Sequence, residues 1–155
     1  MIPTLIAPFS GRVVSLADIA DPVFSAQLLG PGLGIEPTND NNMTVLAPAD
    51  GRITKVFPHA YVIEIPVGTQ QYSILIHLGL DTVRLKGEGL RPLVQADQEV
   101  SAGQVIASWD PGTIAEQGYS ATSPIVLLEG TSEQIETLAS PGTLLSVGQE
   151  LLRLL

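Results

Sequence analysis

The chain has 155 residues, the length of one domain, and its 45% hydrophobic and 15% charged residues are typical of a folded protein; we predict one domain over residues 1–155. It contains no cysteine, which excludes disulfides, thiolate-bound zinc and cysteine nucleophiles, and its net charge of −9 disfavours nucleic acid and favours a basic protein partner. Because no leader pattern opens the chain and no apolar run approaches the ~20 residues that span a bilayer, we expect a cytoplasmic protein without stable membrane insertion.

Short strands are predicted along the whole chain. Clusters of Gly, Pro, Asn and Asp separate brief runs of Val, Ile and Leu, a spacing typical of an all-β sandwich or barrel. Residues 7–13 (APFSGRV) resemble residues 47–53 (APADGRI), and residues 100–105 (VSAGQV) resemble residues 145–150 (LSVGQE), with a glycine where a tight turn needs positive φ. Chance similarity among turns is the alternative. We predict duplicated β-units that close one antiparallel sandwich.

Helical signals are short. The apolar spacing over residues 19–29 includes a turn of helix. Asp110 and Pro111 form an N-cap followed by a proline at the first helical position, which predicts a helix through Glu116. Ser132 is predicted to cap a short helix that carries Ile135 and Leu138. None of these segments is long enough to form a layer, so the fold class remains all-β with one to three short helical turns.

The clearest strand covers residues 72–78. Its even-numbered residues share one face, and His77 lies on the other face with Ser73 and Leu75. Because the strand is apolar on both faces, His77 is predicted to project from a covered sheet into apolar surroundings.

A hairpin is predicted to bring the two histidines of the chain together. Residues 61–65 form a second strand that follows His59, and residues 66–71 form the connecting loop. Antiparallel pairing then places residues whose numbers sum to about 136 or 137 opposite one another, so that His59 faces His77. Two neutral imidazoles provide a nucleophile with a hydrogen-bond partner, or half of a zinc site.

A family resemblance is carried by residues 74–83 (ILIHLGLDTV) and 85–89 (LKGEG). This string closely resembles the phosphohistidine signature of the glucose-type enzyme IIA domain of the bacterial phosphoenolpyruvate-dependent sugar phosphotransferase system. The resemblance covers almost the whole chain and implies a compact antiparallel β-sandwich. Further similar segments are 6–8, 10–11, 21–24, 34–37, 47–51, 59–60 and 147–148.

The resemblance also implies an activity. His77 would accept a phosphoryl group on Nε2 from the phosphocarrier protein HPr and pass it to a cysteine on a sugar-specific IIB domain, in partnership with a IIB/IIC permease. His59 would hydrogen-bond the phosphate. No cofactor or metal is required, although His59 and His77 offer an incidental zinc site. The residues implied in partner docking are the acidic Asp21 and Asp81 and the apolar collar of Val23, Phe24, Leu28, Leu29, Leu78 and Val83.

The sequence departs from the family pattern beside the second histidine. The family has a polar segment with a threonine there, whereas Phe57 and Pro58 lead directly into His59, and Gln71 replaces an expected glycine. These departures keep a second hypothesis open, a regulatory or binding paralogue that does not serve transport.

A zinc hydrolase is a distant third hypothesis. It would use His59, His77 and Asp81 as ligands, but strand residues four apart lie ~13 Å apart, and no histidine would remain as a base.

Overall fold

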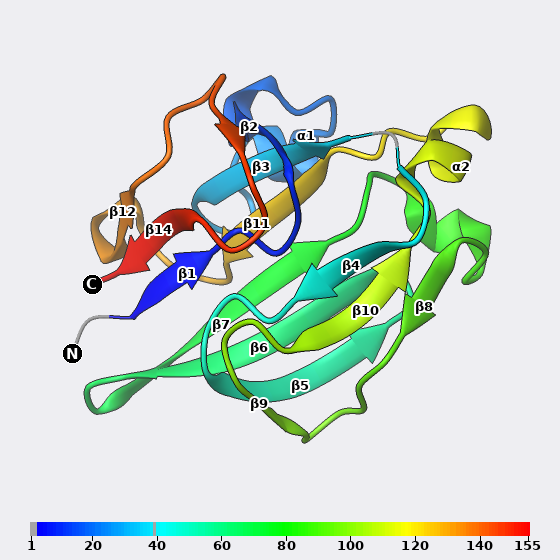
Figure 1. Ribbon diagram of the computed structural model, residues 1–155. Helices are drawn as coiled ribbons and strands as arrows, with labels where there is room; N and C mark the ends of the chain where they lie inside the picture. The colour runs from blue at the N-terminus through cyan, green and yellow to red at the C-terminus, as the bar shows by residue number, and fades with distance from the viewer. Residues whose placement is uncertain (1–2, 39) are drawn as a thin grey trace.

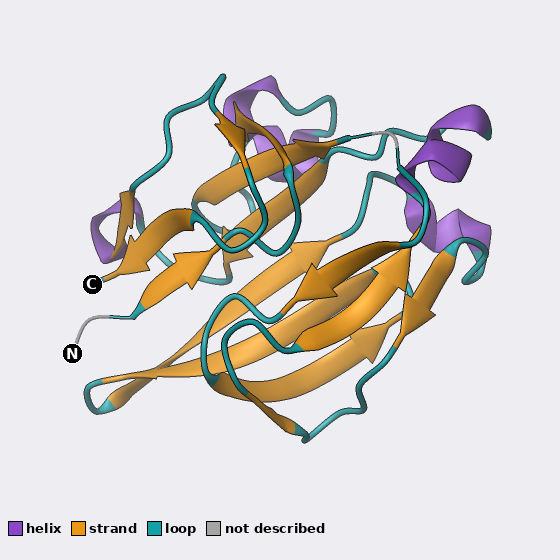
Figure 2. Ribbon diagram, in the orientation of Figure 1, coloured by secondary structure: helices purple, strands orange, loops and turns teal. Residues whose placement is uncertain are grey.

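Three antiparallel sheets contain the strands of the computed structural model, which describes residues 3–38 and 40–155 (Figures 1 and 2). The largest sheet has the order β13-β2-β3-β11-β7-β6-β5-β9, and the two smaller sheets have the orders β1-β14-β12 and β4-β10-β8. The predicted all-β antiparallel sandwich is therefore confirmed.

The large sheet comprises β2 (Gly11–Ser15), β3 (Gly32–Pro37), β5 (Gly51–Phe57), β6 (Ala60–Val67), β7 (Gln70–His77), β9 (Glu99–Val100), β11 (Ser123–Leu127) and β13 (Leu144–Leu145). The smaller sheets comprise β1 (Thr4–Ile6), β4 (Met43–Leu46), β8 (Leu90–Pro92), β10 (Val105–Trp109), β12 (Ile135–Thr137) and β14 (Glu150–Leu154).

The helical segments are short and lie at the periphery of the sheets (Figure 2). They are the 3-10 turns Leu16–Asp18, Thr82–Leu85 and Ser132–Gln134 and the α-helices α1 (Pro22–Ser25) and α2 (Pro111–Glu116). In the part of the chain that the structure describes, no helix has the length and apolarity needed to cross a membrane.

Two of the three helix predictions are confirmed. The segment 19–29 contains α1, and α2 has the predicted bounds. The helix predicted to carry Ile135 and Leu138 is wrong, because Ile135 begins β12 and pairs with Leu154 of β14. Interstrand hydrogen bonds replace the helical ones there, and only the preceding turn is helical.

The predicted duplication is visible in the topology. Read from its two ends, the large sheet has corresponding halves, β13-β2-β3-β11 and β9-β5-β6-β7, and each half has its own small sheet. The hydrogen bonds correspond as well: the Ala7 amide donates to the Gln149 carbonyl and the Ala47 amide to the Gln104 carbonyl, both at 2.7 Å. Gly148 and Gly103 both have positive φ, as predicted. A chance similarity among turns would not produce this correspondence.

The core has two parts, one on each face of the large sheet. The larger part lies between the large sheet and the two small ones and contains Trp109, Tyr61 and Phe9. The smaller part covers the opposite face of β6, β7 and β11, where the segment containing α1 packs. Its buried members are Leu16, Ile19, Phe24, Ala60, Val62, Leu75, Leu80 and Val126.

The β6–β7 hairpin has the predicted register. Ala60 pairs with His77 and Val67 with Gln70, so every pair along the two strands agrees with the antiparallel alignment expected from the sequence. The predicted loop over residues 66–71 is too long, because both strands continue to a two-residue turn. That turn uses Gly68 at φ +62°. The alternation along β7 directs Ile74 and Ile76 into the larger core part, which leaves His77 on the opposite face.

Candidate functional site: a histidine pair at the end of the large sheet

His77 is the last residue of β7, and its ring is held by one short hydrogen bond. Its Nδ1 lies 2.6 Å from the carbonyl oxygen of Gly79. A carbonyl only accepts, so Nδ1 carries the proton and the neutral ring has its lone pair on Nε2. The local chain therefore leaves the lone pair of the neutral ring on Nε2.

The backbone at Gly79 makes this bond possible. Gly79 has φ +79°, and a Cβ atom there would lie 2.7 Å from both the Ser120 carbonyl oxygen and Cγ2 of Thr82. Positive φ and lack of space both require glycine at this position. The chain can thus turn back immediately after β7 and present the Gly79 carbonyl to the His77 ring.

His59 occupies the tight turn between β5 and β6. Phe57 pairs with Ala60, so Pro58 and His59 form a two-residue connection, and the Leu78 amide donates to the His59 carbonyl at 2.8 Å. The centroids of the two imidazole rings are 5.3 Å apart, in an edge-to-face arrangement. The predicted proximity of His59 and His77 is confirmed to within one residue, because Ala60 is the direct partner of His77.

Burial lowers the pKa of both histidines. For His59 the second cause is the neighbouring His77. For His77 the effect of burial is partly offset by the Gly79 carbonyl and by the carboxylates of Asp21 and Asp81, which raise its pKa. Both imidazoles are therefore neutral at pH 7, the state in which one can act as a nucleophile.

The two predicted acidic residues flank the His77 ring through different local structures. The Asp21 side chain caps α1 and accepts a hydrogen bond from the Val23 amide at 3.0 Å. Asp81 is exposed and adopts a left-handed backbone conformation just before the 3-10 turn Thr82–Leu85. Both carboxylates act on His77 through their charge.

The predicted apolar collar divides into exposed and buried residues. Val23, Leu28 and Val83 are exposed to 40%, 70% and 59%, and Leu29 is partly buried. Leu78 is completely buried and Phe24 is 5% exposed, so these two do not offer contact surface to a partner as the sequence suggested. Leu78 belongs to the core between the sheets.

Phe24 instead belongs to the smaller core part and packs beside the His77 ring. Its ring lies edge-on to His77, with centroids 5.4 Å apart. A second aromatic residue, Phe57, lies beside His59 at 5.8 Å and is 49% exposed. Sequence reasoning gave Phe57 no role; its signal is its place directly before the Pro58-His59 turn.

Sequence reasoning also missed two buried hydroxyl groups behind the site. Thr82 donates to the Leu78 carbonyl at 2.6 Å, and Ser123 accepts from the Gly79 amide at 3.1 Å. Thr82 lies inside the HLGLDT string, which could have drawn attention to it. Nothing in the local sequence connects Ser123 with Gly79, because β11 reaches β7 only through long-range pairing.

A three-ligand metal site is not formed here. Within residues 3–38 and 40–155, no three or more His, Asp or Glu side chains come close enough together to hold a metal ion. The ligand set of His59, His77 and Asp81 that the zinc hydrolase hypothesis needs is therefore not assembled.

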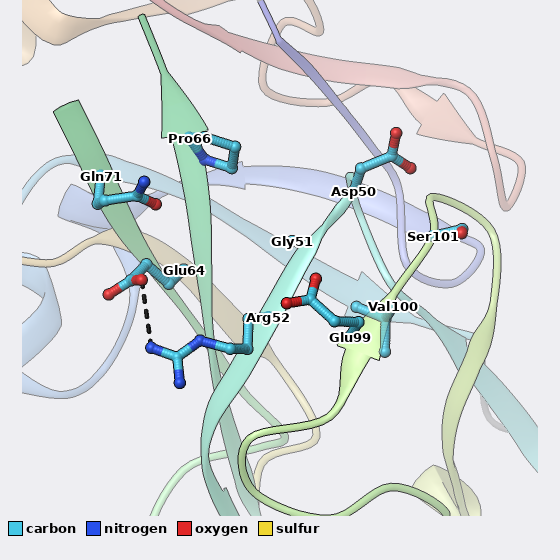
Figure 3. Close-up of a pocket in the computed structure, with 9 residues that line it drawn as sticks. All are labelled: Asp50, Gly51, Arg52, Glu64, Pro66, Gln71, Glu99, Val100 and Ser101. Atoms are coloured by element: carbon cyan, nitrogen blue, oxygen red, sulfur yellow. Dashed lines mark hydrogen bonds and ion pairs between the residues drawn. The ribbon is translucent and has the colours of Figure 1, made fainter. Parts of the chain in front are cut away.

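A hollow of 550 Å³ lies at the far end of β5 from His59 (Figure 3). Arg52 extends across it and is paired with Glu64 at 3.4 Å and with Asp97 at 3.1 Å. This guanidinium is already neutralised by two carboxylates, and the hollow contains neither histidine. We therefore take the histidine pair, and not this hollow, as the candidate site.

Comparison with known proteins agrees with this geometry. A family model described as "phosphoenolpyruvate-dependent sugar phosphotransferase system, EIIA 1" matches residues 3–133. The glucose-specific EIIA component of Bacillus cereus is 38% identical over 137 residues, which cover 86% of this chain and 79% of that protein. The glucosamine-specific EIICBA component of Bacillus subtilis is 38% identical over 135 residues, which are 86% of this chain and 20% of that protein.

The similarity in fold covers almost the whole chain. The solved structure of glucose permease IIA from Mycoplasma capricolum superposes with a TM-score of 0.86 and 31% sequence identity, covering 99% of this chain and 96% of that one. Family model, sequence relatives and fold agree over most of the chain. The chain therefore belongs to the EIIA 1 family of the phosphoenolpyruvate-dependent sugar phosphotransferase system.

Proposed function

We propose that this phosphotransferase component carries a phosphoryl group on Nε2 of His77 during sugar uptake. The observation that carries the proposal is the 2.6 Å bond between His77 Nδ1 and the Gly79 carbonyl, which leaves the Nε2 lone pair as the reactive site. The lowered pKa of His77 keeps that lone pair free of a proton at neutral pH.

The proposed transfer is a displacement at phosphorus. The Nε2 lone pair of His77 forms a P–N bond while the P–N bond to the HPr histidine breaks, and the electron pair of that bond remains on the departing imidazole. In the second step a cysteine thiolate of a IIB domain attacks the same phosphorus and forms an S–P bond, while the P–Nε2 bond breaks and its electron pair returns to Nε2. Such transfers depend mainly on positioning and on charge stabilisation.

His59 is proposed as the group that hydrogen-bonds the phosphoryl oxygens. Its ring lies 5.3 Å from that of His77, centroid to centroid, and its position is fixed by the tight turn after Pro58. A neutral imidazole has one N–H that can donate to a phosphate oxygen. The threonine that the family carries before this histidine has no counterpart in the Phe57-Pro58 segment, so His59 would supply this donation without it.

HPr and the IIB/IIC domains are the proposed partners. Support for the IIB/IIC domains comes from relatives named EIICBA and EIIBCA components, such as those of Bacillus subtilis and Corynebacterium glutamicum. The exposed side chains of Val23, Leu28 and Val83 offer apolar contact beside the site, and the net charge of −9 favours a basic partner.

We expect association with HPr to slow as salt is raised, because screening shortens the reach of the electrostatic field to about 8 Å near physiological ionic strength.

The test is transfer from phosphoenolpyruvate through enzyme I and HPr, followed by intact mass measurement. A gain of about 80 Da that is lost in acid and retained in base is expected for phosphohistidine, and His77→Ala should remove it. Labelling that persists in His77→Ala would contradict the assignment.

Treatment with EDTA tests the role of zinc. Phosphorylation that is equal before and after the treatment would support the view that zinc, if it bridges His59 and His77, is incidental.

A second candidate function is a regulatory or binding module that keeps the site without serving transport. It is favoured by the shortened segment before His59. A chain that accepts phosphate from HPr but passes none to any IIB domain would support this alternative over the carrier.

A further inference from the structure

Two hydroxyl side chains stand out by their burial. Thr82 and Ser123 are completely enclosed, each with 0% exposure, although their side chains are small and polar. Burying a hydroxyl group is unfavourable unless it is hydrogen-bonded, so the partners of these two groups indicate what they stabilise. Thr82 bonds to Leu78 and Ser123 bonds to Gly79, the two residues that follow His77. Among the described residues, neither hydroxyl group bonds to an imidazole.

The peptide group between Leu78 and Gly79 is fixed at both ends. Thr82 Oγ1 donates to the Leu78 carbonyl at 2.6 Å, and the Gly79 amide donates to Ser123 Oγ at 3.1 Å. The Ser123 hydroxyl proton is directed to the Ala121 carbonyl at 2.9 Å, which leaves a lone pair to accept from Gly79.

The next peptide group, between Gly79 and Leu80, is bonded in the same way. Its carbonyl accepts from His77 Nδ1 at 2.6 Å, and its amide donates to the Ser120 carbonyl at 2.9 Å. Two successive peptide planes are therefore held by four hydrogen bonds. Gly79 lies between them in a left-handed conformation with no room for a side chain.

We infer that Thr82 and Ser123 are positioning residues for phosphoryl transfer: by fixing the Leu78–Gly79 peptide they direct the Gly79 carbonyl at Nδ1 of His77 and so reserve Nε2 for the reaction. The catalytic part of this inference rests on the proposed function. The tautomer of His77 in the free protein is a property of the fold alone and can be measured without any partner.

A neutral imidazole exists in two tautomeric forms. In the absence of a directed partner, the proton can reside on either nitrogen, and the form with the proton on Nε2 has no lone pair there with which to attack phosphorus. If the Leu78–Gly79 peptide loses one anchor, its buried polar group has no partner and the plane can rotate to find one. The Gly79 carbonyl then moves away from Nδ1, and both tautomers become populated.

The experiment combines nitrogen NMR of the histidine rings with single-turnover phosphorylation by phospho-HPr. Thr82→Val removes a hydroxyl group at almost constant volume, Thr82→Ser retains it, and Ser123→Ala removes the second anchor. We expect the wild type and Thr82→Ser to hold the proton on Nδ1 of His77. Thr82→Val and Ser123→Ala should show a mixture of tautomers and a rate lower by about tenfold to a hundredfold.

Val45→Ala is the control for a general loss of stability. Val45 is completely buried on β4, in the sheet β4-β10-β8, and has no hydroxyl group. This variant should lower the unfolding temperature while leaving the His77 tautomer and the phosphorylation rate unchanged.

Two results would overturn the inference: an unchanged His77 tautomer in folded Thr82→Val and Ser123→Ala, or an equal loss of rate in Val45→Ala. If Thr82→Val does not fold, Ser123→Ala decides the question through the same peptide plane. A shifted tautomer in the variants, together with a wild type that phospho-HPr does not label, would uphold the positioning of the ring and refute the proposed function separately.

Discussion

The two histidines differ in how the chain holds them, and this difference suggests unequal roles. His77 ends a strand and donates through Nδ1 to Gly79, whereas His59 sits in a turn after Pro58. The first arrangement leaves the lone pair of the neutral His77 ring on Nε2, the atom that we propose to carry the phosphoryl group. The second leaves the His59 ring beside it, where we propose that it donates a hydrogen bond to that group.

Replacing each histidine by glutamine should separate these roles. Glutamine can donate a hydrogen bond but cannot change its protonation state. His59→Gln should still be phosphorylated by HPr, while onward transfer to a IIB cysteine should fall by about 100-fold. His77→Gln should lose both steps. Rapid-quench labelling of both proteins measures this, and an equal loss of acceptance in the two would refute the division of roles.

The lowered histidine pKa values predict a pH effect on stability. Burial is the main cause of the lowered pKa of both His59 and His77, so the unfolded chain binds protons at a higher pH than the folded one. As pH falls below the usual value of 6.5, protonation of the unfolded state lowers the free energy of unfolding. Thermal unfolding at about pH 7.5 and about pH 5.5 should show a smaller loss in His77→Gln than in wild type. Equal losses would show that His77 makes no contribution.

At the scale of the element, the turn after β7 depends on Gly79. Gly79→Ala combines a left-handed backbone, which costs about 1–2 kcal/mol for alanine, with close contacts to Ser120 and Thr82 that cost about 1–3 kcal/mol more. Gly103→Ala is the matched control, since its φ is +86° and no atom lies within 4 Å of the added Cβ. Urea unfolding should show the larger loss at Gly79; equal losses would mean that the crowding is relieved at no cost.

The segment containing α1 and the turn after Asp81 present the exposed part of the collar. Val83→Ser removes an exposed apolar side chain and should weaken the complex with HPr by about tenfold, with no change in unfolding temperature. Phe24→Ser removes a buried ring that contacts His77 and should cost about 3 kcal/mol or more of stability. Calorimetric titration and thermal unfolding distinguish the two effects. Unchanged affinity in Val83→Ser would place the docking surface elsewhere.

At the scale of the molecule, the duplicated halves carry equivalent turn contacts. The Ser101 amide donates to the side chain of Gln104 at 3.1 Å, and the Ser146 amide donates to the side chain of Gln149 at 2.8 Å. These bonds lie in different halves of the sandwich and share no partner. Their contributions to stability should therefore be independent.

Single and double substitutions test this equivalence. Gln104→Ala and Gln149→Ala should each lower the free energy of unfolding by about 1 kcal/mol, and the double variant by their sum within about 0.5 kcal/mol. Chemical denaturation of the three variants gives the comparison. A strongly non-additive result would show that the two halves are coupled through these turns.

Much of the local structure was determined by the sequence itself. The alternation along residues 72–78 placed His77 on the face away from Ile74 and Ile76, and the hairpin alignment brought it beside His59. The repeated glycines marked positive φ at Gly103 and Gly148. These inferences succeed because they depend on the period of a strand and on the conformations open to glycine, both of which are local properties.

Only the tertiary structure decided which of these residues a partner can reach and which groups hold the site. Leu78 reads from the sequence as part of an apolar collar, yet the core between the sheets encloses it completely. Ser123 reads as an ordinary loop or strand residue, yet the pairing of β11 with β7 brings its hydroxyl group to the Gly79 amide. The period of a strand determines which face a side chain takes, whereas packing between segments distant in the sequence determines what covers that face and which buried polar groups meet.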